Sequence, residues 1–370
     1  MTAGRATMAL LTLALLLTGC GAPPSPPPPA GCPAGGWDAA LLWSSETEPA
    51  GEVVFTRGDR VAGRQALPYV GLEAAPTEGL YRTPTATWLK SNGNANRDRT
   101  HVVRYATDTC TAQAFAVTEP VLRSVSMAED AFTTTNTLNG AAEVRRRTLD
   151  GTLTRETRFP GLTLTALAPA AGSLYALGTT MGSDADTAVL VELDAVSLDE
   201  KRRITLPDVA GSNTLIAQGD TLYYPQTVVH GPGNSEREGV RLGVVTLPDL
   251  TLSTVDLGVE APDVLAPVGA DLYIAHNFMN PGFRDTDDYD TLTRYSPARG
   301  TVDRFEVGRG LLTLAAHGDR LFVVNQTAQG TPTLTTYRLP DMEKVTTVEV
   351  PPPAGGHYYV AGILTPPEPA

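Results

Sequence analysis

Short segments of alternating apolar and polar residues, separated by turn residues, recur along almost the whole chain. The clearest recurrence is a polar turn followed by a leucine and an aromatic residue, at Leu174-Tyr175, Leu222-Tyr223, Leu272-Tyr273 and Leu321-Phe322. Successive leucines in this series are 48, 50 and 49 residues apart. Less regular copies precede them at Leu42-Trp43, Leu80-Tyr81 and Ala131-Phe132, which makes seven copies. Because side chains alternate across a strand, each leucine and its aromatic neighbour should pack on opposite faces of a sheet.

Each repeat predicts four short strands. In the last complete repeat the expected strands cover residues 311–316, 320–326, 333–338 and 344–350, and in the repeat before it residues 263–268, 271–278, 291–295 and 301–307. Turns such as Leu247-Pro248-Asp249 separate the third strand from the fourth, as expected for hairpins. The 35 glycines and 30 prolines are spread too densely for long amphipathic helices. The expected fold class is therefore all-β.

Four antiparallel strands in about 40 to 50 residues are typical of a propeller blade. The repeat pattern resembles bacterial seven-bladed β-propellers of the surface-layer and quinoprotein-like type, and the resemblance implies seven four-stranded blades over residues 37–366. Residues 39–44 read as the second strand of a blade, and residues 358–364 form a strand without a repeat of its own. We expect this last strand to complete the first blade and close the ring. Six blades with an irregular N-terminal piece are the alternative, because the first three copies are the least regular.

The N-terminal segment has the pattern of an export signal. Arg5 precedes an apolar run at residues 8–17, which is shorter than the ~20 residues needed to span a bilayer. The run ends in Leu17-Thr18-Gly19-Cys20, which resembles the lipobox of bacterial lipoproteins. The resemblance implies that residues 1–19 are a signal peptide and that Cys20 carries diacylglycerol and a further acyl chain such as palmitate. The alternative is an ordinary secretory signal with an incidental cysteine.

The segment that follows has the composition of a tether. Residues 20–36 are rich in proline, glycine and alanine, and such segments favour extended conformations with little to bury. The lipoprotein resemblance implies an exported protein anchored by lipid to the cell membrane or to an outer membrane, and Gly21 favours the outer membrane where the organism has one. Residues 367–370 form a short tail.

The charge of the chain argues against nucleic acid as a partner. The formal net charge is −13, and phosphate backbones are repelled by acidic surfaces. A dense basic run lies at Arg145 to Arg147, in which alternation turns Arg146 to the opposite face from the other two. We interpret this run as a solvated strand edge.

Two cysteines remain beyond Cys20. Cys32 and Cys110 would be exported together with no other cysteine to pair with, so a disulfide is the simplest prediction. A metal site is the less favoured alternative, because neither cysteine has a second cysteine or a histidine at ligand spacing.

The connections between the second and third expected strands are long, which marks a candidate binding face. They cover residues 88–100, 178–187, 229–239 and 277–290. The candidate contact residues on this face are Trp88, Tyr224, His230, His276, Phe278, Phe283 and Tyr289. Four of the five histidines, His101, His230, His276 and His357, fall on this side, but they belong to different repeats.

An acidic stretch in the last of these connections is the one candidate cation site. Asp285, Asp287 and Asp290 could offer oxygen ligands to calcium. The glycine and the terminal glutamate of a calcium-binding loop are missing, so a solvated acidic loop is the preferred interpretation. We expect no other cofactor.

The sequence predicts no catalytic residue. It contains no Gly-x-Ser-x-Gly elbow, no His-Glu-x-x-His, no phosphate-binding glycine loop and no dinucleotide fingerprint. The first hypothesis is a monomeric, non-enzymatic module that binds an envelope protein or a glycan through its long-loop face. The alternative is a propeller enzyme of the lactonase or lyase type, with a metal or histidine site at the mouth of the channel.

Overall fold

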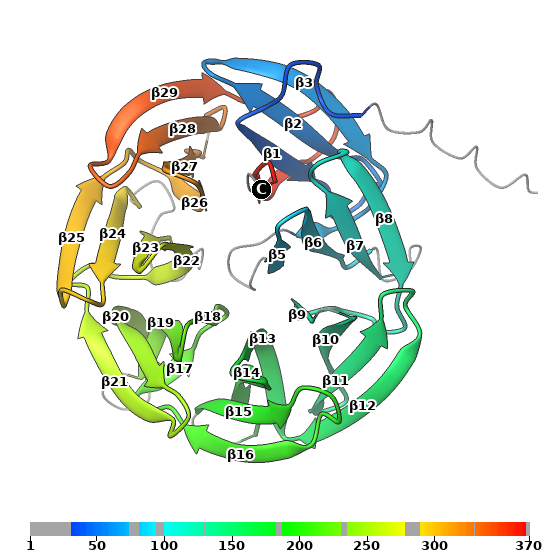
Figure 1. Cartoon of the computed structure of the whole chain (residues 1–370), viewed down its shortest axis with the longest axis vertical. Coiled ribbons are helices and arrows are strands. Elements are labelled where there is room, and N and C mark those ends of the chain that lie inside the picture. The colour runs from blue at the N-terminus through cyan, green and yellow to red at the C-terminus, as the bar shows by residue number, and fades with distance from the viewer. Residues whose placement is uncertain are drawn as a thin grey trace, which may run out of the picture.

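The computed structural model describes residues 31–73, 81–93, 100–128, 130–182, 187–230, 235–277, 289–328 and 330–367. These residues form the strands β1 to β30 in seven sheets arranged around a common centre (Figure 1). Within the described ranges no helix reaches the length and apolarity that crossing a membrane would require. The expected seven-bladed, all-β propeller is thus confirmed, and the six-bladed alternative is excluded.

The first three blades contain β1 to β12 together with the last strand, β30. Blade 1 consists of β30 (Tyr359–Leu364), β1 (Ala39–Ser44), β2 (Gly51–Arg57) and β3 (Arg60–Leu67), from the inside outwards. Blade 2 consists of β4 (Leu72–Glu73) and β5 (Tyr81–Thr83), both paired with β6 (Ala86–Ser91), and then β7 (His101–Ala106) and β8 (Thr111–Ala116). Blade 3 consists of β9 (Ser124–Met127), β10 (Ala131–Leu138), β11 (Ala141–Thr148) and β12 (Leu153–Pro160).

The remaining four blades follow in chain order. Blade 4 consists of β13 (Leu162–Ala170), β14 (Ser173–Thr180), β15 (Ala188–Asp194) and β16 (Glu200–Thr205). Blade 5 consists of β17 (Val209–Gly211) and β18 (Ile216–Gln218), both paired with β19 (Thr221–His230), and then β20 (Glu236–Thr246) and β21 (Thr251–Asp256). Blade 6 consists of β22 (Pro262–Val268), β23 (Asp271–His276), β24 (Thr291–Ser296) and β25 (Thr301–Glu306). Blade 7 consists of β26 (Leu311–His317), β27 (Arg320–Asn325), β28 (Thr333–Arg338) and β29 (Glu343–Glu349).

The two ends of the chain meet in blade 1. Strand β30 pairs antiparallel with β1, with Leu42 opposite Gly362 and Trp43 opposite Val360 across a bulge. Figure 1 shows the red C-terminal end lying inside the blue N-terminal blade. The predicted closure of the ring by the last strand is confirmed, and it covers the inner edge of β1.

The core lies between the blades. Among the described residues the buried apolar side chains form seven clusters, and each cluster joins two neighbouring blades. In blade 6, Leu272 belongs to the cluster shared with blade 5, whereas Tyr273 belongs to the cluster shared with blade 7. The predicted alternation therefore explains how one β-strand supplies two interfaces.

The less regular N-terminal copies of the repeat do not all occupy equivalent positions. Tyr81 lies on β5, a first strand, and Trp88 on β6 takes the second-strand position in blade 2 instead. Trp88 of blade 2 packs against the following blade, 3, just as Tyr273 of blade 6 packs against blade 7. Trp43 of blade 1 and Phe132 of blade 3 instead pack against the preceding blades, 7 and 2. The copy at Leu80-Tyr81 was therefore placed on the wrong strand by the spacing alone.

The ring has two distinct ends. The long-connection face carries the links from second to third strands, among them residues 92–100, 181–187, 231–235 and 277–290, and the links between blades. The short-turn face carries the turns from third to fourth strands at residues 58–59, 107–110, 149–152, 195–199, 247–250, 297–300 and 339–342. The second-to-third link of blade 3 is short, because Asn139 and Gly140 both have positive φ, 51° and 73°, as a two-residue hairpin turn requires.

The predicted disulfide is present. The sulfur atoms of Cys32 and Cys110 are 2.01 Å apart and link the N-terminal segment to the β7–β8 turn of blade 2. The segment continues to Trp37, whose ring packs edge-on against Phe55 with 5.3 Å between ring centroids. The cysteines therefore do not form a metal site.

Candidate binding surface

Two of the aromatic side chains predicted as contact residues are part of the core. Trp88 is 5% exposed and stacks on Phe115, with 5.8 Å between ring centroids. Tyr224 is 2% exposed and lies over Gly243, where an added Cβ would come within 2.0 Å of the tyrosine ring. A partner cannot reach either side chain, so we remove both from the candidate surface. Aromatic residues in alternating strands bury themselves between blades, and the sequence pattern does not separate this role from contact.

The histidines on the long-connection face do not gather in one place. His276 is buried, with Nδ1 3.0 Å from the carbonyl oxygen of Glu260 and Nε2 3.0 Å from Thr293 Oγ1. His230 ends β19 in blade 5, His101 begins β7 in blade 2, and His357 precedes β30. In the described ranges no three His, Cys, Asp or Glu side chains lie close enough together to hold a metal ion.

A third predicted contact residue, Tyr289, is 2% exposed and also part of the core, so it too is removed from the candidate surface; it contacts three blades. Its hydroxyl donates to Glu238 Oε1 of blade 5 at 2.9 Å, while its ring packs in the cluster shared by blades 6 and 7. Of the acidic candidates, Asp290 accepts a hydrogen bond from Thr291 Oγ1 through Oδ1, at 2.8 Å. The predicted residues Phe278, Phe283, Asp285 and Asp287 lie outside the described residues.

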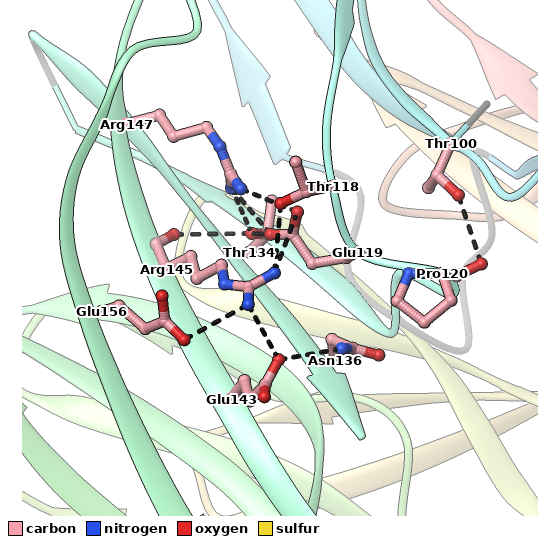
Figure 2. Close-up of polar contacts among 10 residues, drawn as sticks. All are labelled: Thr100, Thr118, Glu119, Pro120, Thr134, Asn136, Glu143, Arg145, Arg147 and Glu156. Carbon is pink, nitrogen blue, oxygen red and sulfur yellow. Dashed lines mark hydrogen bonds and ion pairs between the residues drawn. The ribbon is translucent and has the colours of Figure 1, made fainter. Parts of the chain in front are cut away.

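A buried ionic network lies between blades 2 and 3 (Figure 2). Arg147 donates to both carboxylate oxygens of Glu119 at 2.7 Å, and Thr134 Oγ1 donates to the same carboxylate at 2.6 Å. The side chains of Glu119 and Arg147 are 1% and 3% exposed. Arg145 lies on the same face and contacts Glu143 at 3.1 Å and Glu156 at 3.2 Å. Interpreting the arginine run as a solvated strand edge was therefore wrong, although its predicted alternation is correct.

The electrostatics of the network favour the ionised carboxylate. Burial alone would raise the pKa of Glu119, but the hydrogen bonds from Arg147 and Thr134 and the positive charge of Arg147 outweigh it, so the pKa lies below its usual value. Sequence reasoning missed Glu119 because its partner is 28 residues away in the chain. The available signal was that two arginines on one face of a buried strand require a carboxylate.

The network fixes the segment that links the two blades. We refer to residues 117–123 as the blade 2–3 connector. Thr100 Oγ1 donates to Pro120 O at 3.2 Å (Figure 2), and Asn92 Oδ1 accepts from the amide of Leu122 at 2.7 Å. Lys90, which is ion-paired with Glu73, donates to Arg123 O at 3.2 Å. The connector is therefore held by side chains from both blades.

Two apolar side chains are exposed where this connector meets blade 3. Val121 and Leu138 are each 39% exposed. The amide of Arg123 donates to Thr135 O at 2.9 Å, which extends the β9–β10 ladder and carries the connector alongside the end of β10. The connector and the end of β10 therefore present exposed apolar side chains on backbone that is held by neighbouring segments.

A buried acid lies at the interface of blades 5 and 6. Asp263 sits in a bulge of β22 and is 1% exposed, and its Oδ1 has no hydrogen-bond partner among the described residues. Burial raises its pKa to about 7, and a hydrogen bond with Thr227 opposes this shift only in part. Asp263 was not among the residues that the sequence singled out.

A shallow groove of about 670 Å³ runs along the outer edge of blade 6, towards blade 7. Its charged lining residue Arg294 is already engaged, since it contacts Asp303 at 2.6 Å and donates to Pro340 O at 2.9 Å. Arg304, also in the lining, donates to Leu257 O at 3.1 Å. These arginines bond to carbonyl oxygens of the neighbouring blades 7 and 5.

The fold is similar to that of several solved structures. A hydrazine synthase from Kuenenia stuttgartiensis matches with 13% identity and a TM-score of 0.55, over 78% of this chain and 89% of its own. A protein of unknown function from Desulfotomaculum acetoxidans matches with 12% identity and a TM-score of 0.55, over 90% and 100%. A proposed 6-phosphogluconolactonase from Bacteroides fragilis matches with 12% identity and a TM-score of 0.56, over 88% and 97%.

These likenesses concern the fold alone, because identities this low carry no activity from one propeller to another. No protein-family model matches the chain, and no curated protein matches it.

Proposed function

We propose that this protein is a lipid-anchored binding or scaffold module of the cell envelope, which holds a protein or glycan partner on its long-connection face. The lipobox-like sequence at Cys20 supports the anchor, and the propeller supplies a rigid platform for connecting segments. Two or more acyl chains hold a protein stably at a membrane, whereas one chain gives only marginal binding.

The observation that supports the binding role is that polar side chains of the connecting segments and adjacent strands are bonded within the protein. Glu119, Arg147, His276 and Tyr289 are each buried and bonded to neighbouring segments. Exposed apolar side chains remain at Val121, on the blade 2–3 connector, and at Leu138, at the end of β10. A surface that is fixed before it meets its partner loses little entropy on binding, which favours recognition.

A photo-crosslinking experiment in intact cells tests the binding role. A photoreactive amino acid at Leu138 should capture a specific adduct, and the same amino acid at Val196 on the short-turn face is the matched exposed control. Val121→Asp should reduce the Leu138 adduct several-fold without changing the amount of folded protein. Absence of an adduct at Leu138, or the same adducts at both positions, would contradict the proposal.

Metabolic labelling tests the anchor. Incorporation of a fatty-acid analogue should be lost in Cys20→Ser and retained in Cys32→Ser. Label that persists in Cys20→Ser would remove the anchor from the proposal.

A propeller enzyme of the lactonase or lyase type is the second candidate, and Asp263 is the observation that favours it. A carboxyl whose pKa is near 7 is suited to general acid-base catalysis, but Asp263 is 1% exposed, so a substrate reaches it only if the interface of blades 5 and 6 opens. The proposed lactonase among the similar folds makes lactones and sugar acids the first substrates to assay. Turnover that disappears in Asp263→Asn, with the fold intact, would establish this candidate, and no turnover across such a panel would reject it.

A further inference from the structure

The described chain enters the propeller at the short-turn face. Cys32 is bonded to Cys110, which lies in the β7–β8 turn of blade 2. Gly31 lies against the carbonyl oxygen of Thr109 in the same turn. The N-terminal segment is therefore attached at its very start to a turn between a third and a fourth strand.

The residues that follow stay on the same face. Pro33 packs against Gly63 of β3, where an added Cβ would lie 3.2 Å from the proline ring. Asp38 Oδ2 accepts a hydrogen bond from the amide of Gly58, in the β2–β3 turn, at 2.8 Å. Asp38 also lies 3.6 Å from Arg320, which begins β27 directly after a first-to-second-strand turn. Residues 31–38 thus follow the short-turn face across blades 2, 1 and 7.

The length of chain between the lipid and this entry point is small. Eleven residues lie between Cys20 and Cys32, and the chain from one cysteine to the other spans at most roughly 40 Å when fully extended. Strands of about seven residues make a blade roughly 25 Å deep before its connections are added. If the long-connection face were directed at the membrane, the segment between Cys20 and Cys32 would have to cross the depth of a blade, which would use most of its extended length. The short segment therefore favours an orientation with the short-turn face towards the membrane.

The distribution of exposed apolar side chains agrees with this orientation. Seven large apolar side chains are exposed among the described residues. Five of them lie in a third-to-fourth-strand turn or within three residues of one, at Leu149, Leu153, Val196, Leu252 and Val345. The same turns also contain aspartates, such as Asp108 and Asp150, which anionic headgroups would repel. The covalent attachment, and not charge, must therefore set the orientation.

We propose that the short-turn face is directed at the lipid bilayer and that the Cys32–Cys110 disulfide fixes this orientation, so that the long-connection face points away from the membrane. The proposal rests on the lipid anchor in the proposed function. It deepens that function, because it leaves the blade 2–3 connector accessible to a partner in the space beyond the membrane.

Fluorescence quenching in reconstituted vesicles tests the orientation. The full lipidated chain is placed in phosphatidylcholine vesicles that contain a headgroup-attached quencher, with a fluorophore at Val196→Cys or at Leu138→Cys. Quenching should be several-fold stronger for the label at Val196 than for the label at Leu138. In a Cys32→Ser, Cys110→Ser background the difference should become clearly smaller.

The outcomes separate the two proposals. Equal or reversed quenching in the protein with an intact disulfide overturns the orientation, while retention on the vesicles still supports the anchor. A protein that does not stay on the vesicles overturns both the anchor and the orientation. An unchanged difference without the disulfide overturns the role given to the Cys32–Cys110 bond. The crosslinking test of partner binding uses no vesicles and is decided independently.

Discussion

Glu119, in the blade 2–3 connector, accepts two hydrogen bonds of 2.7 Å from Arg147, which lies on β11, the third strand of blade 3. Removing one member of a buried ion pair leaves an uncompensated charge and costs about 3–5 kcal/mol. We expect Arg147→Met to lower the free energy of unfolding by that amount in urea denaturation at pH 7. Arg338→Met is the control, because Arg338 pairs with Glu343 through exposed side chains and its loss should cost at most about 1 kcal/mol. Equal losses in the two variants would contradict a buried, paired Glu119.

The same pair should make the protein sensitive to acid. The pKa of Glu119 is lowered in the folded state, so the ionised carboxylate contributes stability that is present above the unfolded-state pKa of about 4.3. This contribution is lost as the pH falls through the lower, folded-state pKa. Urea midpoints measured between pH 3 and pH 6 should fall less steeply with acid in Glu119→Gln than in the unchanged protein. Parallel curves for the two proteins would show that Glu119 does not titrate as described.

Asp263 should make the stability of the protein depend on pH in the opposite direction. Its folded-state pKa of about 7 lies above the unfolded-state value of about 3.9, so its contribution to stability is complete below pH 4 and is lost as the pH rises towards 7. Asp263→Asn should therefore be more stable at pH 8, relative to the unchanged protein, than it is at pH 4, by about 1.4 kcal/mol for each unit between the two pKa values. Denaturation curves at the two pH values measure this difference, and no difference would mean that the acid is ionised in the folded protein.

The disulfide should contribute substantially to stability. It closes a long segment of chain, with a sequence separation of 78 residues. Closing such a loop restricts the unfolded ensemble, so loss of the bond should cost about 2–4 kcal/mol. Comparison of Cys32→Ser, Cys110→Ser and the double variant by thermal unfolding tests this. The three variants should lose the same amount, because each removes the same bond.

The buried tryptophan of blade 2 should behave as core. Trp88→Ala removes contacts with Phe115 and Phe132 and should cost about 3–5 kcal/mol. Leu138→Ser, on the exposed end of β10, should change stability by no more than about 0.5 kcal/mol. A small effect of Trp88→Ala would return this residue to the candidate surface.

The repeat made the fold predictable from sequence. Leu272 and Tyr273 alternate strictly and recur at a nearly constant spacing, and that pattern has few structural solutions besides sheets packed side by side. Blade 1 was predictable as well, because one strand was missing at its start and one strand was left over at the end of the chain. Tyr81 and Trp88 were harder to place, since both are aromatic, lie seven residues apart and occur in adjacent strands.

The candidate surface was less predictable because it depends on contacts that are distant in sequence. Arg147 looks like a surface residue until Glu119 is placed beside it, and the sequence around either residue does not indicate that the two pair. Tyr224 looks like a contact residue until Gly243 is found beneath its ring. Whether such a side chain is buried depends on the residues of the neighbouring strand or connector, and the spacing of the repeat does not predict which residues those are.

The pairing of β30 with β1 also affects how the protein can be made. The first blade lacks its inner strand until β30 has been synthesised, so the inner edge of β1 stays unpaired until then. A copy cut short by a premature stop or by a protease would leave β1 with an uncovered edge, a template for aggregation and for recognition by quality control. The ring therefore closes only in molecules that contain both β1 and β30.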